Sequence, residues 1–445
     1  MAKASSAERP GSARGSSREG LHFARISARR VWGSSWFVPG LYVMGALALS
    51  VGLFRWDEAD PISLSRSISS SSASAALAAL ASGMLAFTGF VTSVILMLVQ
   101  FGTSEFSSRF VASFRRNRTL LFSLSTFSAT FLFALVSTAQ IGRGTAAFVP
   151  TRTVIAALLL TLLSILMFLI LIDRTSDGLR VARVVQTVDR DGRRAFDAVY
   201  PSSLSDAAAG QEIAHSLADR TPVQTIPIGP LGRVVVAIDQ TGIADLAQRY
   251  DALVELVPAV GGHVSSGGRL LNVYGSHQLP ERRLRRYVAL GDERTVDDDP
   301  AFALRMLVDV AIKALSPAVN DPTTAVQSLD RIEDLLRYAA AKQLSVGVVV
   351  DARGTARLVY PTPTWEDLVQ LALDEIRAFG AGQYQVTRRM RAMLDDLIAD
   401  VPESRRPALA TQSDLLATAV ASAIPESQRA DALVPDRQGI GMARR

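Results

Sequence analysis

Four long apolar runs constrain this chain more than any other feature of its sequence. They are Phe37–Phe54, Ala75–Phe101, Leu120–Ile141 and Val154–Ile172. Each is about as long as the roughly 20 residues that cross a hydrocarbon core about 30 Å thick. Because lipid offers no partners for backbone polar groups, each run is expected to be a helix. The sequence therefore predicts a four-helix transmembrane domain over residues 36–173.

The polar flanks predict a soluble body outside the membrane. Residues 1–35 are rich in Ser, Gly and Arg, and we expect a disordered basic N-terminal tail rather than a cleavable signal peptide. The whole chain is 49% hydrophobic yet 20% charged, which a purely membranous chain would not be. The expected fold class is an α-helical membrane domain with four transmembrane helices, followed by a cytosolic α+β body.

Lysine and arginine are unevenly divided between the two sides of the predicted spans. The N-terminal tail, the loop after the second span and the segment after the fourth span hold seventeen of them, against four on the other side. Positive charge accumulates on cytoplasmic loops. We therefore expect a multi-pass protein of the cell inner (plasma) membrane with both termini in the cytoplasm.

The second predicted span differs from the others in length and in its small and hydroxyl residues. Its pore-lining or helix-contact candidates are Ser82, Thr88, Gly89, Thr92, Ser93 and Gln100. Small residues permit close helix packing. One hypothesis is that this span lines a pore or contacts another subunit; the alternative is that it packs against the other spans of the same chain. No charged residue lies in the core of any predicted span. This argues against a proton-coupled pump but not against a passive channel.

An amphipathic stretch follows the second span. Phenylalanines recur at every fourth residue from Phe106 to Phe114, and the arginines that follow are Arg115, Arg116 and Arg118. Such a segment is expected to lie on the inner leaflet, where the arginines attract anionic lipid headgroups. The alternative is that these arginines only set the topology.

Behind the spans, residues 174–221 predict a helical connector and residues 222–278 a small β-rich domain. A spacing similar to the hairpin of lipoyl and biotinyl carrier domains is formed by Gly261, Val264, Gly267 and Leu270. The β-rich domain contains no lysine to carry such a cofactor. We expect no cofactor, and either a barrel-sandwich used for assembly or a generic hairpin.

Residues 279–425 predict a mainly helical domain with one hairpin, whose strands flank Ala352–Gly354, and residues 426–445 predict a loose C-terminal tail. Asp299 and Pro300 are suited to start a helix as an acidic N-cap and a first-turn proline. Arg305, Asp309 and Lys313 then stand four residues apart, which predicts an ion-pair ladder on one face. Further on, Thr364 caps a helix that stops at Gly380, and two more follow near 384–400 and 403–423.

A sharp break follows the first of these helices. Ser316-Pro317 ends it, and Asn320-Asp321-Pro322 starts the next. Two hypotheses account for Asn320 and Asp321. They cap the second helix, or they bind a ligand together with the free backbone amides at the start of that helix. The acidic run Asp297–Asp299 likewise offers oxygens to a hard cation, although its spacing matches no calcium loop and helix starts favour acidic residues anyway. We therefore predict no metal.

Four segments carry a resemblance to a known family. They are Ser104–Arg109, Val234–Leu270, Gly291–Phe302 and Ala314–Ala325. In these segments the chain resembles the uncharacterised bacterial integral-membrane family known as domain of unknown function 2254. The resemblance implies the fold and membrane residence, but no reaction, cofactor or substrate. The cytosolic site candidates that it marks are Arg294, Thr295, Asp299, Ser316, Pro317, Asn320, Asp321 and Pro322.

No enzymatic motif accompanies these features. The sequence has no P-loop, dinucleotide fingerprint or nucleophile elbow, its four histidines are far apart, and it has no cysteine. We therefore expect no enzyme and no nucleic-acid partner. The leading hypothesis is an oligomeric channel or transporter in the lipid bilayer with a cytosolic gating or vestibule domain. The alternative is a membrane-anchored sensor or scaffold whose cytosolic domain binds a ligand or a protein. A homo-oligomer is expected, since four spans rarely enclose a passage alone.

Overall fold

The computed structural model describes residues 37–60, 70–105, 118–141, 150–178, 181–200, 220–344 and 347–442. These residues form two compact units. The membrane unit comprises the described residues up to Arg183, and the soluble unit comprises those from Val184 onward. Each unit is described separately below.

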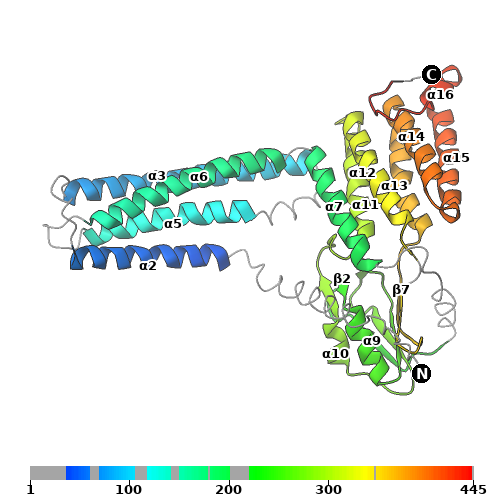
Figure 1. Cartoon of the computed structure of the whole chain (residues 1–445), viewed down its shortest axis with the longest axis horizontal. Helices are drawn as coiled ribbons and strands as arrows, with labels where there is room; N and C mark the ends of the chain where they lie inside the picture. Colours follow the sequence, from blue (N-terminus) through cyan, green and yellow to red (C-terminus); the bar gives the residue numbers. More distant parts are fainter. Residues whose placement is uncertain are drawn as a thin grey trace, which may run out of the picture. The chain divides into compact units, whose positions relative to one another are not determined.

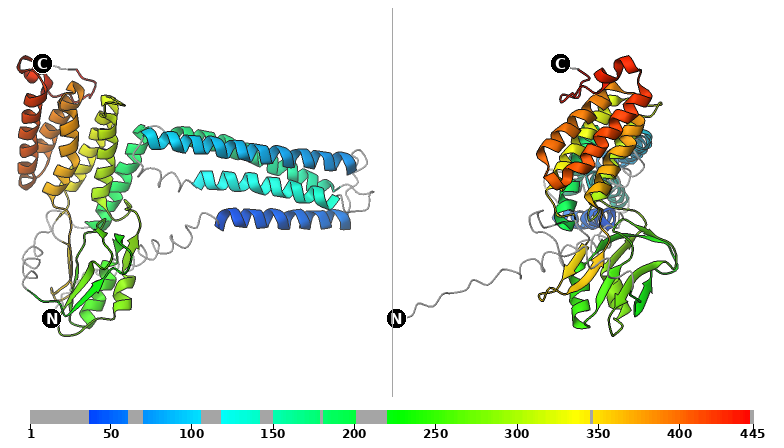
Figure 2. Two further views of the ribbon diagram at one scale, coloured as in Figure 1. Left: turned by 180° about the vertical axis from the view of Figure 1, so that it is seen from behind. Right: turned by 90° about the vertical axis from the view of Figure 1, so that its right-hand side faces the viewer.

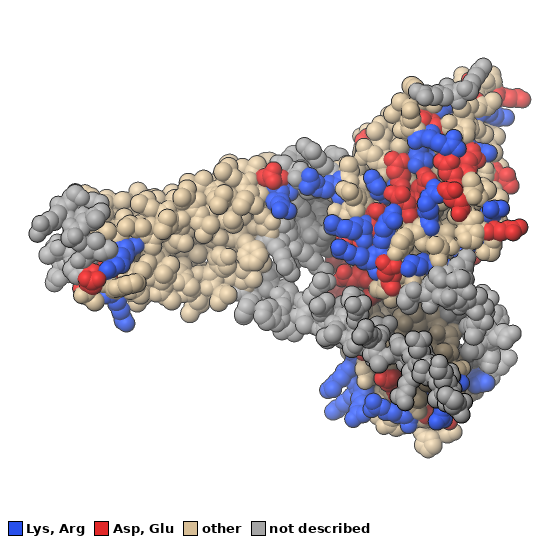
Figure 3. All heavy atoms as spheres, in the orientation of Figure 1, with Lys and Arg blue, Asp and Glu red and all other residues tan. Residues whose placement is uncertain are grey.

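The membrane unit consists of four long apolar helices that lie side by side (Figure 1). They are α2 (Phe37–Ala59), α3 (Ser70–Glu105), α5 (Arg118–Ile141) and α6 (Thr151–Gly178). All four are long and apolar enough to cross a membrane, which confirms that the four apolar runs form helices of the expected length. The face seen in Figure 3 carries charged side chains only near the helix ends. With 36 residues, α3 is about 54 Å long and exceeds the hydrocarbon thickness.

Helix α5 is the centre of the membrane unit and packs against α2, α3 and α6. Its Phe127 and Phe133 are fully buried. Phe133 lies in a cluster with Leu77, whereas Phe127 and Phe168 both make edge contacts with Phe87, at ring-centroid distances of 5.2 and 4.9 Å. The most enclosed of the four helices is therefore the third span and not the second.

Two sheets occupy one end of the soluble unit (Figure 2). The five-stranded sheet has the order β1-β5-β3-β8-β7, and its strands are β1 (Gln224–Pro227), β5 (Arg269–Tyr274), β3 (Leu253–Leu256), β8 (Ala356–Tyr360) and β7 (Gly347–Val350). Its pairs are antiparallel except β3 with β8. The three-stranded sheet has the order β4-β2-β6 and consists of β4 (His263–Val264), β2 (Arg233–Ile238) and β6 (Val288–Gly291).

Helices α9 (Gln240–Arg249) and α10 (Glu281–Arg286) complete this part of the soluble unit. A single apolar cluster joins them to both sheets. It includes Ile226 of β1, Val235 of β2, Ile243 of α9, Leu284 of α10 and Leu358 of β8. The sheets thus share one core although their strands come from distant parts of the chain.

The β-rich part therefore extends beyond the expected boundary at residue 278. Strand β6 and the hairpin β7–β8 come from the segment expected to be mainly helical, and Val254 of β3 pairs with Leu358 of β8. The carrier-domain hairpin is also not formed, because β4 pairs with β2 whereas β5 pairs with β1 and β3. The two glycines do have positive φ, 83° at Gly261 and 72° at Gly267.

The other end of the soluble unit is helical (Figures 1 and 2). Its helices are α7 (Val181–Val199), α11 (Pro300–Ala314), α12 (Pro322–Ala340), α13 (Trp365–Gly380), α14 (Tyr384–Asp400), η2 (Glu403–Arg405), α15 (Arg406–Ala423) and α16 (Glu426–Ala432). The caps expected at Asp299, Asp321 and Thr364 are confirmed. Helix α11 is buried nearly all round, and Gly192 lets α7 approach it closely, since a Cβ there would lie 2.8 Å from the Cβ of Ala303.

The described end of the chain is packed rather than loose, which corrects the expectation for residues 426–442. Asp436 is buried, and its carboxylate accepts hydrogen bonds from the backbone amides of Gln438, Gly439 and Gly441 at 2.7–3.1 Å. The guanidinium of Arg388 on α14 donates to the carbonyls of this segment. One buried carboxylate, which composition alone does not reveal, thus fixes the C-terminal turn.

Candidate functional site

The small and hydroxyl residues of α3 lie on the outside of the membrane unit. Ser82, Gly89, Thr92, Ser93 and Gln100 are exposed, and Thr88 is half-buried. The buried side of α3 carries other residues, among them Leu77, Met84 and Val91. A Cβ built on Gly89 would meet nothing within 4 Å. Among the described residues, therefore, these small residues do not serve packing inside one copy of the chain.

The hydroxyl groups of α3 are satisfied by their own helix. Thr88 Oγ1 donates to the Met84 carbonyl at 2.6 Å, and Thr92 Oγ1 to the Thr88 carbonyl at 2.7 Å. Ser82 and Ser93 bond in the same way to the carbonyl four residues earlier, both at 3.0 Å. Such local bonds let a hydroxyl face tolerate lipid, a second helix or water.

Large side chains are exposed on both α3 and α6, among them Leu85, Phe90 and Met97 of α3, but α3 also exposes a row of small residues. On α6 the exposed residues are large and aliphatic, namely Leu158, Leu159, Leu162, Ile165, Leu166 and Leu169. On α3, a small-residue stripe runs along the exposed surface and consists of Ala75, Ala79, Ser82, Ala86, Gly89 and Ser93. Both faces are exposed, but only that of α3 has the surface that lets another helix backbone approach closely.

The interior of the membrane unit contains hydroxyl groups that the sequence analysis missed. Ser50 Oγ lies 2.9 Å from Ser137 Oγ, and Ser123 Oγ donates to the Met167 carbonyl at 3.3 Å. These bonds join α5 to α2 and α6. The signal is present in the sequence, because the α5 hydroxyls Ser123, Thr126, Thr130 and Ser137 follow a spacing of three, four and seven residues, which places them on one helix face.

One carboxylate is buried at the end of the membrane unit where α2 ends and α6 begins. Helix α2 continues past Phe54 to Ala59 and so includes Asp57, which is 1% exposed. Asp57 accepts hydrogen bonds from the backbone amides of Arg152 and Thr153 at 3.1 and 2.9 Å, and from Thr153 Oγ1 at 2.9 Å. It therefore supplies partners to the start of α6 and ties two helices together.

Arg294 and Asp299 meet at the start of α11. Asp299 Oδ2 accepts from Arg294 Nε and Nη2 at 3.0 and 2.8 Å, while Oδ1 accepts from the Phe302 amide at 3.0 Å. Burial raises the pKa of Asp299, and the Arg294 guanidinium opposes that rise. Gly261 passes so close that a Cβ there would overlap both side chains. Thr295 lies beside the pair in sequence, and its hydroxyl is buried without a partner among the described residues.

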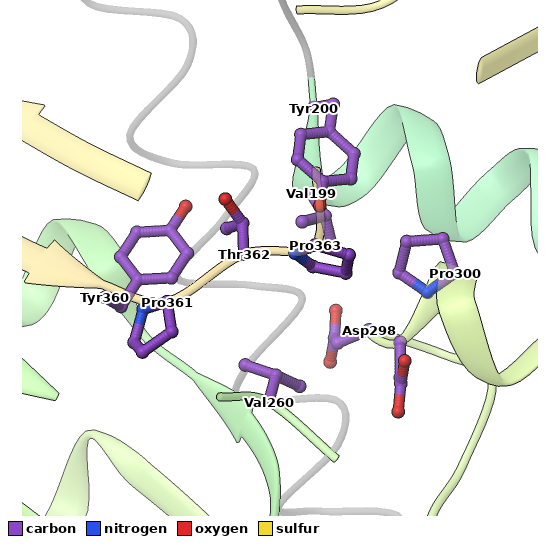
Figure 4. Close-up of a pocket in the computed structure, with 10 residues that line it drawn as sticks. Val199, Tyr200, Val260, Asp298, Pro300, Tyr360, Pro361, Thr362 and Pro363 are labelled. Atoms are coloured by element: carbon purple, nitrogen blue, oxygen red, sulfur yellow. The ribbon is translucent and has the colours of Figure 1, made fainter. Parts of the chain in front are cut away.

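A small cavity adjoins this ion pair (Figure 4). Its lining includes Tyr200 just after α7, Asp298 and Asp299 just before α11, Tyr360 at the end of β8 and Thr362 beyond it. Burial raises the pKa of Tyr200. The cavity volume is about 20 Å³, which accommodates about one water molecule. The residues around the cavity therefore pack the ends of α7, α11 and β8 together. The cavity itself has no room for an organic substrate.

The acidic residues of this region do not converge. Asp299 is directed to Arg294, and Asp292 accepts from Arg233 at 3.1 Å. Across the part of the chain that the structure describes, no group of three or more His, Asp or Glu side chains is placed to hold a metal ion.

The remaining candidates marked by the family resemblance lie at the opposite end of α11, about 22 Å away for a 15-residue helix. Ser316 Oγ donates to the Lys313 carbonyl at 2.7 Å, before Pro317 in the turn that ends α11. Asp321 caps α12 next to Pro322, accepting from the Thr324 amide at 3.1 Å. Asn320 has a φ of 48° and accepts from Gln383 Nε2 at 3.3 Å. The eight candidates thus form two separate structural junctions rather than one site.

The proposed lipid contact after α3 is only partly covered by the structure. Arg115 and Arg116 lie outside the described residues, and α5 begins at Arg118.

Comparisons with known proteins agree with the membrane architecture. An uncharacterized protein of Mycobacterium bovis and one of Mycobacterium tuberculosis are each 29% identical to the chain over 349 residues. The match covers 76% of this chain and 66% of each relative, so the chain spans just under two thirds of the length of these curated relatives. No solved structure matches the chain. Residues 32–396 match the family described as "Predicted membrane protein (DUF2254)". The chain therefore belongs to the DUF2254 family of predicted membrane proteins.

Proposed function

We propose that the protein is an oligomeric channel or transporter of the inner membrane, in which the α3 helices of neighbouring copies meet around a passage. The observation that carries this proposal is the outward position of the small-residue stripe on α3. In lipid, helices associate through close van der Waals packing, and small residues favour that contact. A purely lipid-facing helix has no need of such a stripe, as the leucine-rich outer face of α6 illustrates.

The filled interior of the membrane unit also favours a passage between copies. Phe127 and Phe133 occupy the centre at 0% exposure, and the interior hydroxyls of Thr130 and Ser164 bond to each other. A solute path through one copy would have to break this packing. A path between copies needs only residues that are already exposed, and Thr92 and Ser93 of α3 provide hydroxyls for its lining.

The dimensions of α3 suit this role. From Ala75 to Ser93 the stripe spans about 27 Å along the helix, close to the roughly 30 Å hydrocarbon core. The stripe can therefore line a contact or a passage across most of the bilayer. In the orientation that the positive-inside rule predicts, the soluble unit lies in the cytoplasm and serves as a gate or vestibule.

The decisive experiment combines flux and oligomeric state in proteoliposomes. Gly89→Leu places a bulky side chain on the stripe and is expected to abolish self-association and ion or solute flux. Gly45→Leu is the matched control, because Gly45 is an exposed glycine of α2 whose added Cβ would also meet nothing within 4 Å. Equal flux in the two variants would overturn the proposal. A monomer without flux that retains soluble partners would instead favour the membrane-anchored scaffold.

A further inference from the structure

We propose that the soluble unit has its own contact with the membrane, a basic surface around α10 that docks on anionic lipid headgroups. This α10 surface is defined by Arg269, Arg282, Arg283, Arg285 and Arg286, together with the exposed Leu231. The proposal rests on membrane residence and does not depend on a passage between copies.

Helix α10 concentrates positive charge on an exposed face. Its six residues include four arginines and one glutamate. Leu284 is 0% exposed and anchors the helix in the core, whereas Arg282, Arg283 and Arg286 are exposed and Arg285 is half-buried. Within the described chain, Arg282, Arg283 and Arg286 have no acidic partner, whereas Arg285 is held by Glu281 at 2.7 Å. Lys and Arg side chains gather over this helix in Figure 3.

A fifth arginine and an apolar side chain adjoin the helix. Arg285 Nη2 donates to the Pro227 carbonyl at 2.6 Å, and Pro227 is the strand partner of Arg269 on β5. The chain then turns through Leu231, which is 65% exposed. Its turn is fixed beside β5, because Ser266 Oγ donates to the Pro230 carbonyl at 2.8 Å. The structure thus holds an exposed leucine four residues after Pro227, which contacts Arg285 and pairs with Arg269.

Arginines beside an exposed leucine favour a lipid surface over other polyanions. The guanidinium groups pair with phosphates in either case, but only a bilayer offers an apolar phase for Leu231. The soluble unit is covalently joined to four membrane helices, so a bilayer surface is present at high effective concentration. Each arginine near an anionic membrane contributes about fivefold to binding, so even a few side chains suffice for docking of a tethered unit.

The chain's lack of cysteine makes a direct test simple. Leu231→Cys is labelled with the environment-sensitive fluorophore NBD in the full-length protein, which is then reconstituted into vesicles of phosphatidylcholine alone or with phosphatidylglycerol. Anionic vesicles are expected to shift the emission to shorter wavelength, and high salt to reverse the shift. Leu415→Cys on α15, also exposed, is the control label and is expected to show no lipid dependence.

The triple variant Arg282→Gln, Arg283→Gln, Arg286→Gln identifies the origin of the shift. These side chains have no acidic partner in the described structure, so the fold is expected to persist, as circular dichroism would verify. The docked-to-undocked ratio should fall on the order of 100-fold. An unchanged Leu231 emission in anionic vesicles, or an undiminished shift in the triple variant, would overturn the proposal. A response to an oligonucleotide in detergent but not to anionic vesicles would overturn it too, and would identify a nucleic-acid surface.

Discussion

Thr130 Oγ1 on α5 and Ser164 Oγ on α6 lie 2.9 Å apart in the interior of the membrane unit, where their residues are 0% and 1% exposed. One of the two hydroxyls donates to the other, and the second can donate to the carbonyl four residues earlier in its own helix, a distance of 2.9 Å for both Thr130 and Ser164. Both hydroxyl protons therefore have acceptors without water. The pair joins α5 to α6, which the Ser123 hydroxyl also links through the Met167 carbonyl.

Replacing Thr130 by valine is expected to weaken this helix pair modestly. Valine keeps the shape of the side chain, and Ser164 keeps its bond to the Leu160 carbonyl. The free energy of unfolding should therefore fall by about 0.6 kcal/mol, and by less than roughly 2 kcal/mol. Unfolding in mixed detergent micelles measures the change. Thr161→Val is the control, since the half-buried Thr161 bonds to the Ala157 carbonyl of its own helix. An equal loss in both variants would contradict a role for the α5–α6 bond.

Asp57→Ala should destabilise the membrane unit by about 1–3 kcal/mol, because it leaves the first amides of α6 and Thr153 Oγ1 without their acceptor. The neighbouring Glu58 is exposed, so Glu58→Ala tests the removal of one carboxylate at the same end. Thermal unfolding in detergent compares the two. We expect a clear shift for the first variant and little for the second.

Gly261→Ala should destabilise the soluble unit more than Gly267→Ala does. Both glycines have positive φ, which costs an alanine about 1–2 kcal/mol. At Gly261 the new methyl also overlaps the Arg294–Asp299 pair, whereas at Gly267 it meets nothing within 4 Å. Thermal unfolding of Gly267→Ala therefore measures the backbone strain alone, whereas that of Gly261→Ala measures the strain together with the steric overlap. Similar melting temperatures would show that the loop at Gly261 moves away at little cost.

The β7–β8 hairpin is expected to lose stability in acid through Asp351. Its carboxylate accepts from the amides of Arg353 and Thr355 at 2.9 and 3.0 Å and from Arg357 Nε at 2.8 Å. The Arg357 hydrogen bond, followed by that of the Thr355 amide, lowers the pKa of Asp351 below its usual value near 3.8. The contribution is thus present above that value and is lost as pH falls through the lower, folded-state pKa.

Amide hydrogen exchange of the hairpin between pH 5 and pH 2, corrected for intrinsic rates, would test this dependence. In Asp351→Asn, the hairpin amides should already exchange faster at pH 5. In the unsubstituted protein, they should reach the same rate, corrected for intrinsic exchange, only near pH 2. Asp414→Asn, at an exposed position on α15, controls for the loss of one charge. A parent hairpin whose protection is independent of pH would contradict the role given to Asp351.

Much of the local structure follows from the sequence because it is decided over short distances. A span needs only enough consecutive apolar residues to cross the hydrocarbon core, so all four were predictable. The caps at Asp299, Asp321 and Thr364 depend on three or four neighbouring residues, and each forms as expected. The Arg305–Asp309 ion pair, at 2.7 Å, follows from a spacing of four on one helix.

What the sequence alone determined is therefore the number of membrane helices, the places where most helices begin and end, and the residues available for capping. Only the tertiary structure decided that α5 is central, that the small-residue stripe of α3 faces outward, and that Gly261 packs against Asp299. It also decided that β3 pairs with the distant β8. The physical reason is that spans and caps are satisfied within a few residues of chain, whereas burial and strand pairing depend on which surfaces meet across long sequence separations.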